Sequence, residues 1–418
     1  MLLPGCANLC CHPGRMINAG LNYTFHREDE KYFFTNILPT YTGLDSFKLL
    51  SDEHVADLNI DYVQPLKTGR FETGLKLRIR EIPTNMQFKP GLNSPLDVNA
   101  GGKATYRETI PALYGNYIFE NDRYEVEAGM RVEYVDLQYE VNASHPVYES
   151  DGYNYLQPFP NLRLAYKLNE SNKFSAFYSR RVDRPNEVDI RIFPKYDDAE
   201  IIKVGNPDLR PQFTSTFELG YKTNWQGGYL YTAAYHKLMD ATITRIGSTI
   251  PGSNLIYNIF QNAGRSYNTG IEIVFSRNFA KWGVANLNLN GYKNTIDAFT
   301  VINEYPERNV YTSQKEELFS GSIKLNTLFR LPGKAEAQIT GIYLAPDLIP
   351  QGKTYSRFSV DAGLKKSIQQ GRGEIFVNAT DLLNTLEIRR EVAGNGFRYT
   401  SDDFLETQVI RLGYSYKF

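Results

Sequence analysis

Apolar and polar residues alternate along most of this chain. From Tyr124 to Tyr134 every second position is apolar or aromatic, and the positions between them are charged or glycine. Segment 71–80 repeats this pattern, and the last residues, 409–418, repeat it with Ile410, Leu412 and two tyrosines on one side. A period of two places alternate side chains on opposite faces of a strand. The pattern therefore predicts antiparallel strands with one apolar and one polar face.

Short polar turns and long polar segments alternate between these predicted strands. The short turns are FHREDEK, QPLKTGR, FENDR, LNESNK, NWQGG, NFAKW, RLPGK and QQGRG. The long segments are 38–52, 82–104, 140–157, 183–211, 247–262, 297–313, 346–354 and 386–403. A soluble sheet or propeller explains the two faces but not this asymmetry, which is typical of a transmembrane β-barrel with short periplasmic turns and long extracellular loops. Two strands per short turn and one terminal strand give about 17 strands.

The composition agrees with an all-β membrane protein. The 418 residues include 30 Tyr and 24 Phe, yet the mean hydropathy is −0.42. The net charge of −1 does not suggest a nucleic-acid partner. No apolar run approaches the roughly 20 residues of a membrane helix. Aromatic residues lie close to the short turns, where a ring girdle at the membrane boundary is expected: Tyr124, Tyr166, Phe174, Tyr221, Tyr229 and Phe329.

The three cysteines all lie within the first eleven residues, at Cys6, Cys10 and Cys11. Neither a lipoprotein cleavage site nor a zinc site with His12 has the flanking pattern that it requires, so the role of these cysteines stays open. We expect residues 1–15 to be an irregular leader without a domain, and residues 16–418 to form one β-barrel domain.

The directions of the first and last strands predict an incomplete barrel. A first strand near residues 16–25 and a last strand near 404–418 would both run toward the short turns. Neighbouring strands of an antiparallel barrel run in opposite directions. An odd number of strands would then be missing, and we expect the chain to lack the N-terminal part of the barrel.

Two loop motifs carry a family resemblance. They are Arg184-Pro185 and Gly205-Asn206-Pro207-Asp208-Leu209-Arg210-Pro211, and the second leads into Glu218-Leu219-Gly220-Tyr221. With VNATDLLNT (377–385) and the terminal strand, they resemble the barrel of a TonB-dependent outer-membrane receptor, more narrowly the outer membrane β-barrel family common in Bacteroidota. The resemblance covers nearly all of the chain after residue 16. It implies the outer membrane of a Gram-negative cell and a 22-stranded barrel around a plug. We expect that neither a plug nor a TonB-box segment precedes this barrel, which would begin at about the sixth strand.

The motif residues have structural and functional interpretations. Proline fixes φ and glycine permits a tight turn. We therefore interpret Arg184, Pro185, Gly205, Asn206, Pro207, Leu209 and Pro211 as a rigid loop that shapes the barrel rim, with ligand contact as the alternative. The resemblance implies that Tyr414, Tyr416 and Phe418 are a signal for the barrel-assembly machinery. They can equally face lipid and the aromatic girdle.

The sequence contains no catalytic constellation. No His-Glu-x-x-His or Gly-x-Ser-x-Gly motif occurs, and the acidic pairs 197–198 and 402–403 are interpreted as solvated loop charge in preference to calcium ligands. We expect no enzyme activity, no cofactor and no metal site.

The leading hypothesis is nutrient uptake. The chain would form the barrel portion of a TonB-dependent receptor for a siderophore, glycan or peptide, with the TonB complex acting through a plug that this chain does not contain. Its other expected partners are outer-membrane lipid, the barrel-assembly machinery and an unknown small ligand. A passive porin-like or structural barrel is the alternative, followed by a surface adhesin. The DNA upstream of Met1 would distinguish them, since an in-frame signal sequence and plug would favour the receptor.

Overall fold

The computed structural model describes residues 5–9, 14–38, 41–91, 94, 101–142, 145, 147–194, 201–249, 255–279, 281–404 and 406–418, with the backbone alone for 5–9, 36, 38 and 41. Its elements are β1 (Gly5–Leu9), β2 (Met16–Leu38), β3 (Tyr41–Leu66), β4 (Gly69–Lys89), β5 (Gly102–Glu120), β6 (Tyr124–Val141), β7 (Asp151–Lys167), β8 (Asn172–Asp183), α1 (Glu187–Ile190), β9 (Ile201–Val204), β10 (Gln212–Trp225), β11 (Gly228–Asp240), β12 (Ile243–Thr249), β13 (Ile256–Asn262), β14 (Arg265–Phe279), β15 (Gly283–Ile296), β16 (Phe299–Asn303), β17 (Asn309–Ser313), β18 (Glu316–Leu331), β19 (Ala335–Leu344), β20 (Asp347–Ile349), β21 (Gly352–Thr354), β22 (Arg357–Ile368), the 3₁₀ turn η1 (Gln369–Gly371), β23 (Gly373–Thr380), β24 (Glu387–Gly394), β25 (Phe397–Phe404) and β26 (Val409–Tyr416).

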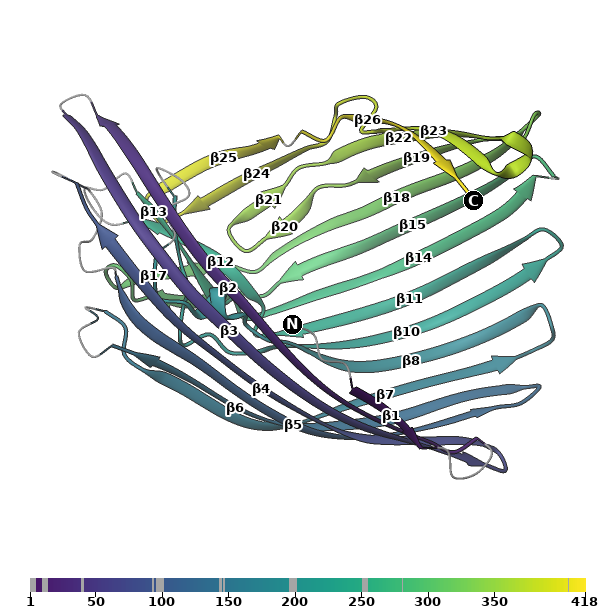
Figure 1. The fold of residues 1–418 in the computed structure, drawn as a ribbon, viewed down its shortest axis with the longest axis horizontal. Coiled ribbons are helices and arrows are strands. Elements are labelled where there is room, and N and C mark those ends of the chain that lie inside the picture. Colours follow the sequence, from purple (N-terminus) through teal and green to yellow (C-terminus); the bar gives the residue numbers. More distant parts are fainter. Residues whose placement is uncertain are drawn as a thin grey trace.

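One curved sheet of 17 strands forms the body of the molecule (Figure 1). Its strands pair antiparallel in the order β1, β2, β3, β4, β5, β6, β7, β8, β10, β11, β14, β15, β18, β19, β22, β23 and β26. Among the described residues no pairing joins β26 to β1 or β2, so this sheet has two edges. The prediction of an all-β antiparallel architecture is confirmed.

The two faces of the sheet differ as the alternation predicts. On β4, Phe71, Leu75 and Ile79 are exposed on the outer face, and their neighbours Arg78 and Arg80 point to the opposite, concave face. The concave face carries charges of both signs that pair across strands, including Arg78 with Asp57 at 2.9 Å and Arg80 with Glu53 at 2.7 Å. A sheet with an apolar convex face and a charged concave face fits a barrel wall between lipid and water.

Seven of the eight predicted short turns are confirmed, and the first is wrong. FHREDEK (25–31) lies inside β2, which pairs with β3 without interruption from Met16 to Leu38. Of the long segment predicted over 38–52, residues 41–52 lie within β3 and Leu38 ends β2, whereas residues 39 and 40 lie outside the described residues. On the outer face beyond Phe25, Arg27 pairs with Asp52 at 2.7 Å. Charged residues therefore occupy both faces where the strand has left the apolar band, and the alternation that marks a strand disappears from the sequence.

The direction of the first long strand also differs from the prediction. Because β3 runs into the short turn before Gly69, its antiparallel partner β2 runs away from the short turns. The direction predicted for residues 16–25 is therefore wrong. The number of strands still agrees with the prediction. Because the first predicted turn is absent, two predicted strands merge into β2, and β1 adds one strand within the segment expected to be irregular.

Cys10 and Cys11 lie outside the described residues, and only the backbone of Cys6 is described.

Aromatic pairs line the outer face next to the short turns. Ring centroids are 5.4 Å apart for Tyr124 and Tyr166, and 4.9 Å apart for Phe174 and Tyr221. The indole ring of Trp282 stacks on Phe329 at 6.2 Å. These positions agree with the predicted girdle. Tyr229 differs, because its ring lies 4.8 Å from the ammonium group of Lys222 on the concave face.

Three small sheets lie at the end of the molecule remote from the short turns: β9 with β12 and β13, β16 with β17, and β20 with β21, β24 and β25 (Figure 1). They belong to the long loops. No described helix is long and apolar enough to cross a membrane.

Candidate functional site

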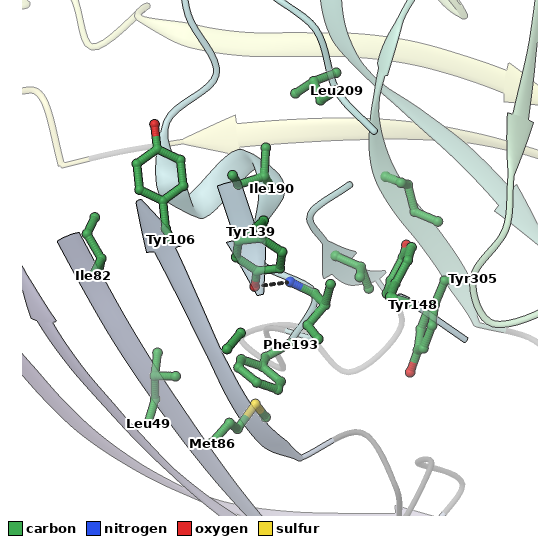
Figure 2. Close-up of a cluster of buried hydrophobic side chains, with 14 of the residues drawn as sticks. Leu49, Ile82, Met86, Tyr106, Tyr139, Tyr148, Ile190, Phe193, Leu209 and Tyr305 are labelled. Atoms are coloured by element: carbon green, nitrogen blue, oxygen red, sulfur yellow. Dashed lines mark hydrogen bonds between the residues drawn. The ribbon is translucent and has the colours of Figure 1, made fainter. Parts of the chain in front are cut away.

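We call residues 184–211 the motif loop, and its described parts, 184–194 and 201–211, pack against the concave wall. Ile190, Ile192 and Leu209 of this loop are almost completely buried. They belong to one apolar cluster with Leu49 and Ile82 of the wall (Figure 2). The backbone N–H of Ile192 donates a hydrogen bond to the hydroxyl of Tyr139 at 3.2 Å. The loop is therefore a packed part of the molecule and not a free extracellular arm.

Gly205 permits the closest approach within the motif loop. A Cβ atom there would lie 2.5 Å from the backbone nitrogen and oxygen of Arg191, so no larger residue fits without movement. The N–H of Gly205 donates to the backbone carbonyl of Arg191 at 2.9 Å, and the N–H of Asn206 donates to the backbone carbonyl of Asp189 at 2.8 Å. These bonds hold the Gly-Asn-Pro turn against α1.

Asn206 joins the motif loop to the hairpin of β12 and β13, which in turn bonds to the hairpin of β16 and β17. Its side-chain amide donates to the carbonyl of Phe260 at 3.0 Å. Beside it, Gln261 donates to Asn303 at 2.7 Å, and Asn303 donates to Ser248 at 3.0 Å. Buried amides of this kind fix loop positions because leaving one unpaired is costly. We call Asn206, Gln261, Asn303 and Ser248 the amide chain.

Ion pairs anchor the first part of the motif loop. Arg184 and Arg131 both pair with the buried carboxylate of Glu133. Arg191 pairs with Glu187 at 2.7 Å and with Glu28 of β2 at 3.0 Å. Burial favours the neutral form of Arg191, but these two carboxylates outweigh it and raise its pKa. The arginine thus stays charged in the packed interior.

The acidic motif residue sits beside another carboxylate. Burial, together with the negative charge and hydrogen bonding of Asp151, raises the pKa of Asp208. Arg210 donates to Asp151 at 2.9 Å, and its guanidinium lies 4.9 Å from the ring centre of Tyr153. The loop end is therefore attached to the start of β7.

A groove of about 570 Å³ lies on the concave face between β4 and β8, and we call it the concave groove. Its floor is a row of directly paired residues on five strands: Glu72, Asn116, Gly129, Asn161 and Ser179. The rings of Phe159 and Phe177 and the arginines 131, 180 and 181 complete its lining. The volume falls within the range of small-molecule sites.

The terminal aromatic residues lie on the outer face of an edge strand. Tyr414 is 54% exposed and donates a hydrogen bond to Gln369 of the short turn at 2.8 Å. Rings of Tyr416 and Phe418 meet edge to face at 5.4 Å. These residues lie next to the short turns, which is compatible with both the expected aromatic girdle and the expected assembly signal. Their role in assembly stays a prediction.

The VNATDLLNT motif closes the loop after β23. The carboxylate of Asp381 is buried and accepts hydrogen bonds from the Thr407 hydroxyl at 2.6 Å and from the N–H of Thr385 at 3.0 Å. Burial alone would raise the pKa of Asp381, but these bonds outweigh it and lower the pKa. The sequence marks this motif by resemblance alone and does not identify its central carboxylate.

No group of three or more potential metal-ligating side chains occurs in the part of the chain that the structure describes. Asp402 and Asp403 pair with Arg389 and Arg390. The pair 197–198 lies outside the described residues.

Sequence reasoning identified the motif loop but missed the partners of the loop and the whole concave groove. Gln261 and Asn303 come from other loops, and Asn116 and Asn161 meet only through the register of β5, β6 and β7. The sequence signal that could have indicated the groove is the presence of asparagines on the polar face of strands whose other polar-face residues are charged.

A family model matches most of the chain. The model of the outer membrane protein beta-barrel family covers residues 11–416. No curated protein sequence matches the chain.

Solved structures of outer-membrane uptake receptors have a similar fold. The ferric yersiniabactin uptake receptor FyuA from Yersinia pestis is 13% identical, with a TM-score of 0.62 over 97% of this chain and 59% of that one. The ferric-catecholate import receptor Fiu from E. coli K12 is 12% identical, with a TM-score of 0.64 over 98% and 62%. The siderophore receptor PiuA from Acinetobacter baumannii is 11% identical, with a TM-score of 0.65 over 98% and 63%. The chain thus spans less than two thirds of the length of each receptor.

Proposed function

We infer the function of this chain from the fact that it belongs to the outer membrane protein beta-barrel family and resides in the outer membrane. We propose that it forms the barrel wall of a TonB-dependent receptor that takes up a small ligand, with the plug supplied by residues outside this sequence. The single observation that supports this most is the fold, which matches three uptake receptors over nearly the whole chain.

The outer end of the molecule supports uptake over passive diffusion. The motif loop covers the concave wall with an apolar cluster, and the amide chain fixes its neighbours. A loop that packs against the inner side of the wall near its outer end narrows an open channel. An energised receptor, which admits ligand only during a conformational change, tolerates such a loop better than a pore does.

Uptake in living cells tests this proposal. A strain deleted for the gene would be grown on a panel of iron, peptide and glycan sources, beside the parent and a strain without TonB. We expect the gene deletion and the TonB deletion to abolish growth on the same source. Growth of the TonB-deficient strain at the parental rate on that source would contradict the receptor proposal.

A conductance measurement addresses the porin-like alternative. The complete gene product would be reconstituted in planar lipid bilayers. We expect no steady current from the resting receptor. A stable ohmic conductance would favour the passive pore.

A further inference from the structure

We propose that the outer face of β2 to β5 binds the phosphorylated sugars of an outer-leaflet glycolipid. Its cations are Lys31 of β2, Lys48 of β3, Lys89 of β4 and Lys103 of β5, and we call these four residues the lysine patch. This goes beyond the proposed function, because it concerns the membrane around the barrel and not the ligand that passes through it.

The strands that carry the lysine patch are long enough to project beyond the membrane. β2 and β3 contain 23 and 26 residues, whereas about 9–11 residues of a tilted strand cross a bilayer. On the outer face the apolar band ends at Phe25, and the ion pair of Arg27 with Asp52 follows it. Residues of β2 after Arg27 therefore lie outside the hydrocarbon.

The four lysines occupy three successive levels of the sheet. Lys31 and Lys48 are directly paired across β2 and β3. Lys103 lies one level nearer the membrane, and Lys89 lies one level farther out. Neighbouring strands are about 4.8 Å apart, and levels on one face are about 7 Å apart along a strand. The lysines therefore gather within about 14 Å in each direction.

Burial assigns the lysine patch to the outer face. Each lysine is adjacent in sequence to a residue of the apolar cluster on the concave face: Tyr32, Phe47, Phe88 and Ala104. Adjacent residues of a strand point to opposite faces. Lys48 is half-buried and the other three lysines are exposed, so all four are accessible from outside the barrel.

The lysine patch lacks compensating carboxylates. Among the described residues of β2 to β5, Asp29 is the only acid on the outer face at these levels, and it lies 3.7 Å from Lys48. Lys31, Lys89 and Lys103 form no ion pair with a described residue. Like charges directly opposite each other on neighbouring strands are unfavourable. The pair of Lys31 with Lys48 therefore indicates an anionic partner outside the chain.

Charges nearer the membrane are neutralised within the wall. Arg107 engages Glu81 at 3.0 Å and Glu140 at 2.5 Å, and Arg27 engages Asp52 at 2.7 Å. These arginines are already paired with carboxylates of the wall. The excess positive charge is thus confined to the levels of the lysine patch.

The height of the lysine patch favours a glycolipid over a phospholipid. The headgroup layer of a phospholipid adds only about 5–8 Å to the hydrocarbon on each side. A strand tilted by about 45° rises about 5 Å per level, so the lysine patch lies about 9–19 Å beyond the level of Phe25. Phosphates of a phospholipid lie below this height, whereas phosphates on the sugars of a glycolipid reach it.

An aromatic ring beside the lysines suits a sugar. Phe33 lies on the level of Lys89 and is 82% exposed on the same face. An exposed ring stacks on the C–H face of a sugar, and the ammonium groups next to it attract phosphate. A phosphorylated sugar meets both requirements.

Binding to the complete gene product, purified in detergent, tests the inference without requiring TonB. Microscale thermophoresis would compare a lipopolysaccharide that has phosphorylated core sugars, the same material after enzymatic dephosphorylation, and phosphatidylglycerol. We expect the phosphorylated glycolipid to bind at least about tenfold more tightly than the other two, and its affinity to fall with added salt. Equal binding of phosphatidylglycerol or of the dephosphorylated material, or no binding of any probe, would overturn the proposal.

Matched variants assign the binding to the lysine patch. Replacing Lys31 and Lys48 together by glutamine should weaken glycolipid binding about 25-fold, at about fivefold per lysine. The control replaces the exposed lysines Lys67 and Lys281 of the short turns, which removes the same charge and should change nothing. Asp29→Asn should strengthen binding by up to about fivefold. Equal weakening by the two double variants would mean that net charge decides, and would contradict the lysine patch.

Unchanged heat-modifiable mobility would establish that each variant is folded. Glycolipid binding by a protein that supports no uptake in cells would refute the receptor proposal alone. Uptake by a protein that binds no glycolipid would refute this inference alone.

Discussion

At the outer end, hydrogen bonds from single polar side chains fix loop residues that do not take part in the sheet. Asp381 organises the turn after β23 with bonds from Thr407, Thr385 and Leu386. Asn206 joins the motif loop to the loop that contains Phe260. Neither bond pattern follows from sequence, because each involves groups separated by more than 20 residues in the chain.

Asp381→Asn should destabilise the loop after β23 by about 1–3 kcal/mol, because an amide cannot accept all of these hydrogen bonds. Since the folded pKa of Asp381 is lowered, its contribution is present above the unfolded pKa near 4 and is lost as the pH falls through the folded value. Thermal unfolding in detergent between about pH 2 and 7 measures both effects. A difference between wild type and variant that did not shrink toward pH 2 would contradict this role for the carboxylate.

Asn206→Ala should release the motif loop from its neighbour. The substitution leaves the half-buried carbonyl of Phe260 without this donor, at a cost of about 1–3 kcal/mol. Limited proteolysis within 184–211 is the measurement, and cleavage should accelerate. The exposed Asn224, which reaches Ser171 at 3.5 Å near the short turns, gives the control Asn224→Ala, for which the cleavage rate should not change. Equal cleavage of the two variants would argue against the amide chain.

At the scale of elements, period-two alternation predicted most strands because lipid and lumen sort side chains by face. It failed at 25–31, where both faces of β2 meet water and Arg27, Glu28 and Asp29 no longer alternate with apolar residues. Likewise the small sheets of the long loops were not predicted. Their cores, such as Ile246 with Phe299, pack between loops and have no common period.

Adjacent residues of β18 test the assignment of faces. Leu325 is exposed on the outer face near the middle of the strand, and Asn326 faces the concave side. Leu325→Arg should cost about 2–4 kcal/mol in a bilayer, and Asn326→Arg should cost little. Urea unfolding in lipid vesicles compares the two. Equal costs would contradict the orientation of the whole sheet.

At the scale of the whole molecule, the two ends of the sheet are stabilised in different ways. The part near the short turns has an apolar convex face and a polar concave face, whereas the outer end has an apolar cluster between loop and wall. The family resemblance predicted the presence of the motif loop. It did not predict that this loop packs inward, because the apolar partners Leu49, Ile82 and Met86 are spread over β3 and β4.

Ile192→Ala should loosen the outer end without affecting the rest of the sheet. Ile192 is fully buried, and its truncation should cost about 2–5 kcal/mol locally. Hydrogen exchange monitored by mass spectrometry should show faster exchange in 184–211 and unchanged exchange in β18 to β26. Faster exchange throughout the sheet would mean that the two parts unfold as one unit.

The amide chain also has a mechanical consequence. A pull on the hairpin of β16 and β17 reaches Asn303 first, and from there Gln261 and the motif loop. Tension applied at one hairpin is therefore distributed over several, and the outer end should resist a tip or a tethered bead as a single block that ruptures in one event.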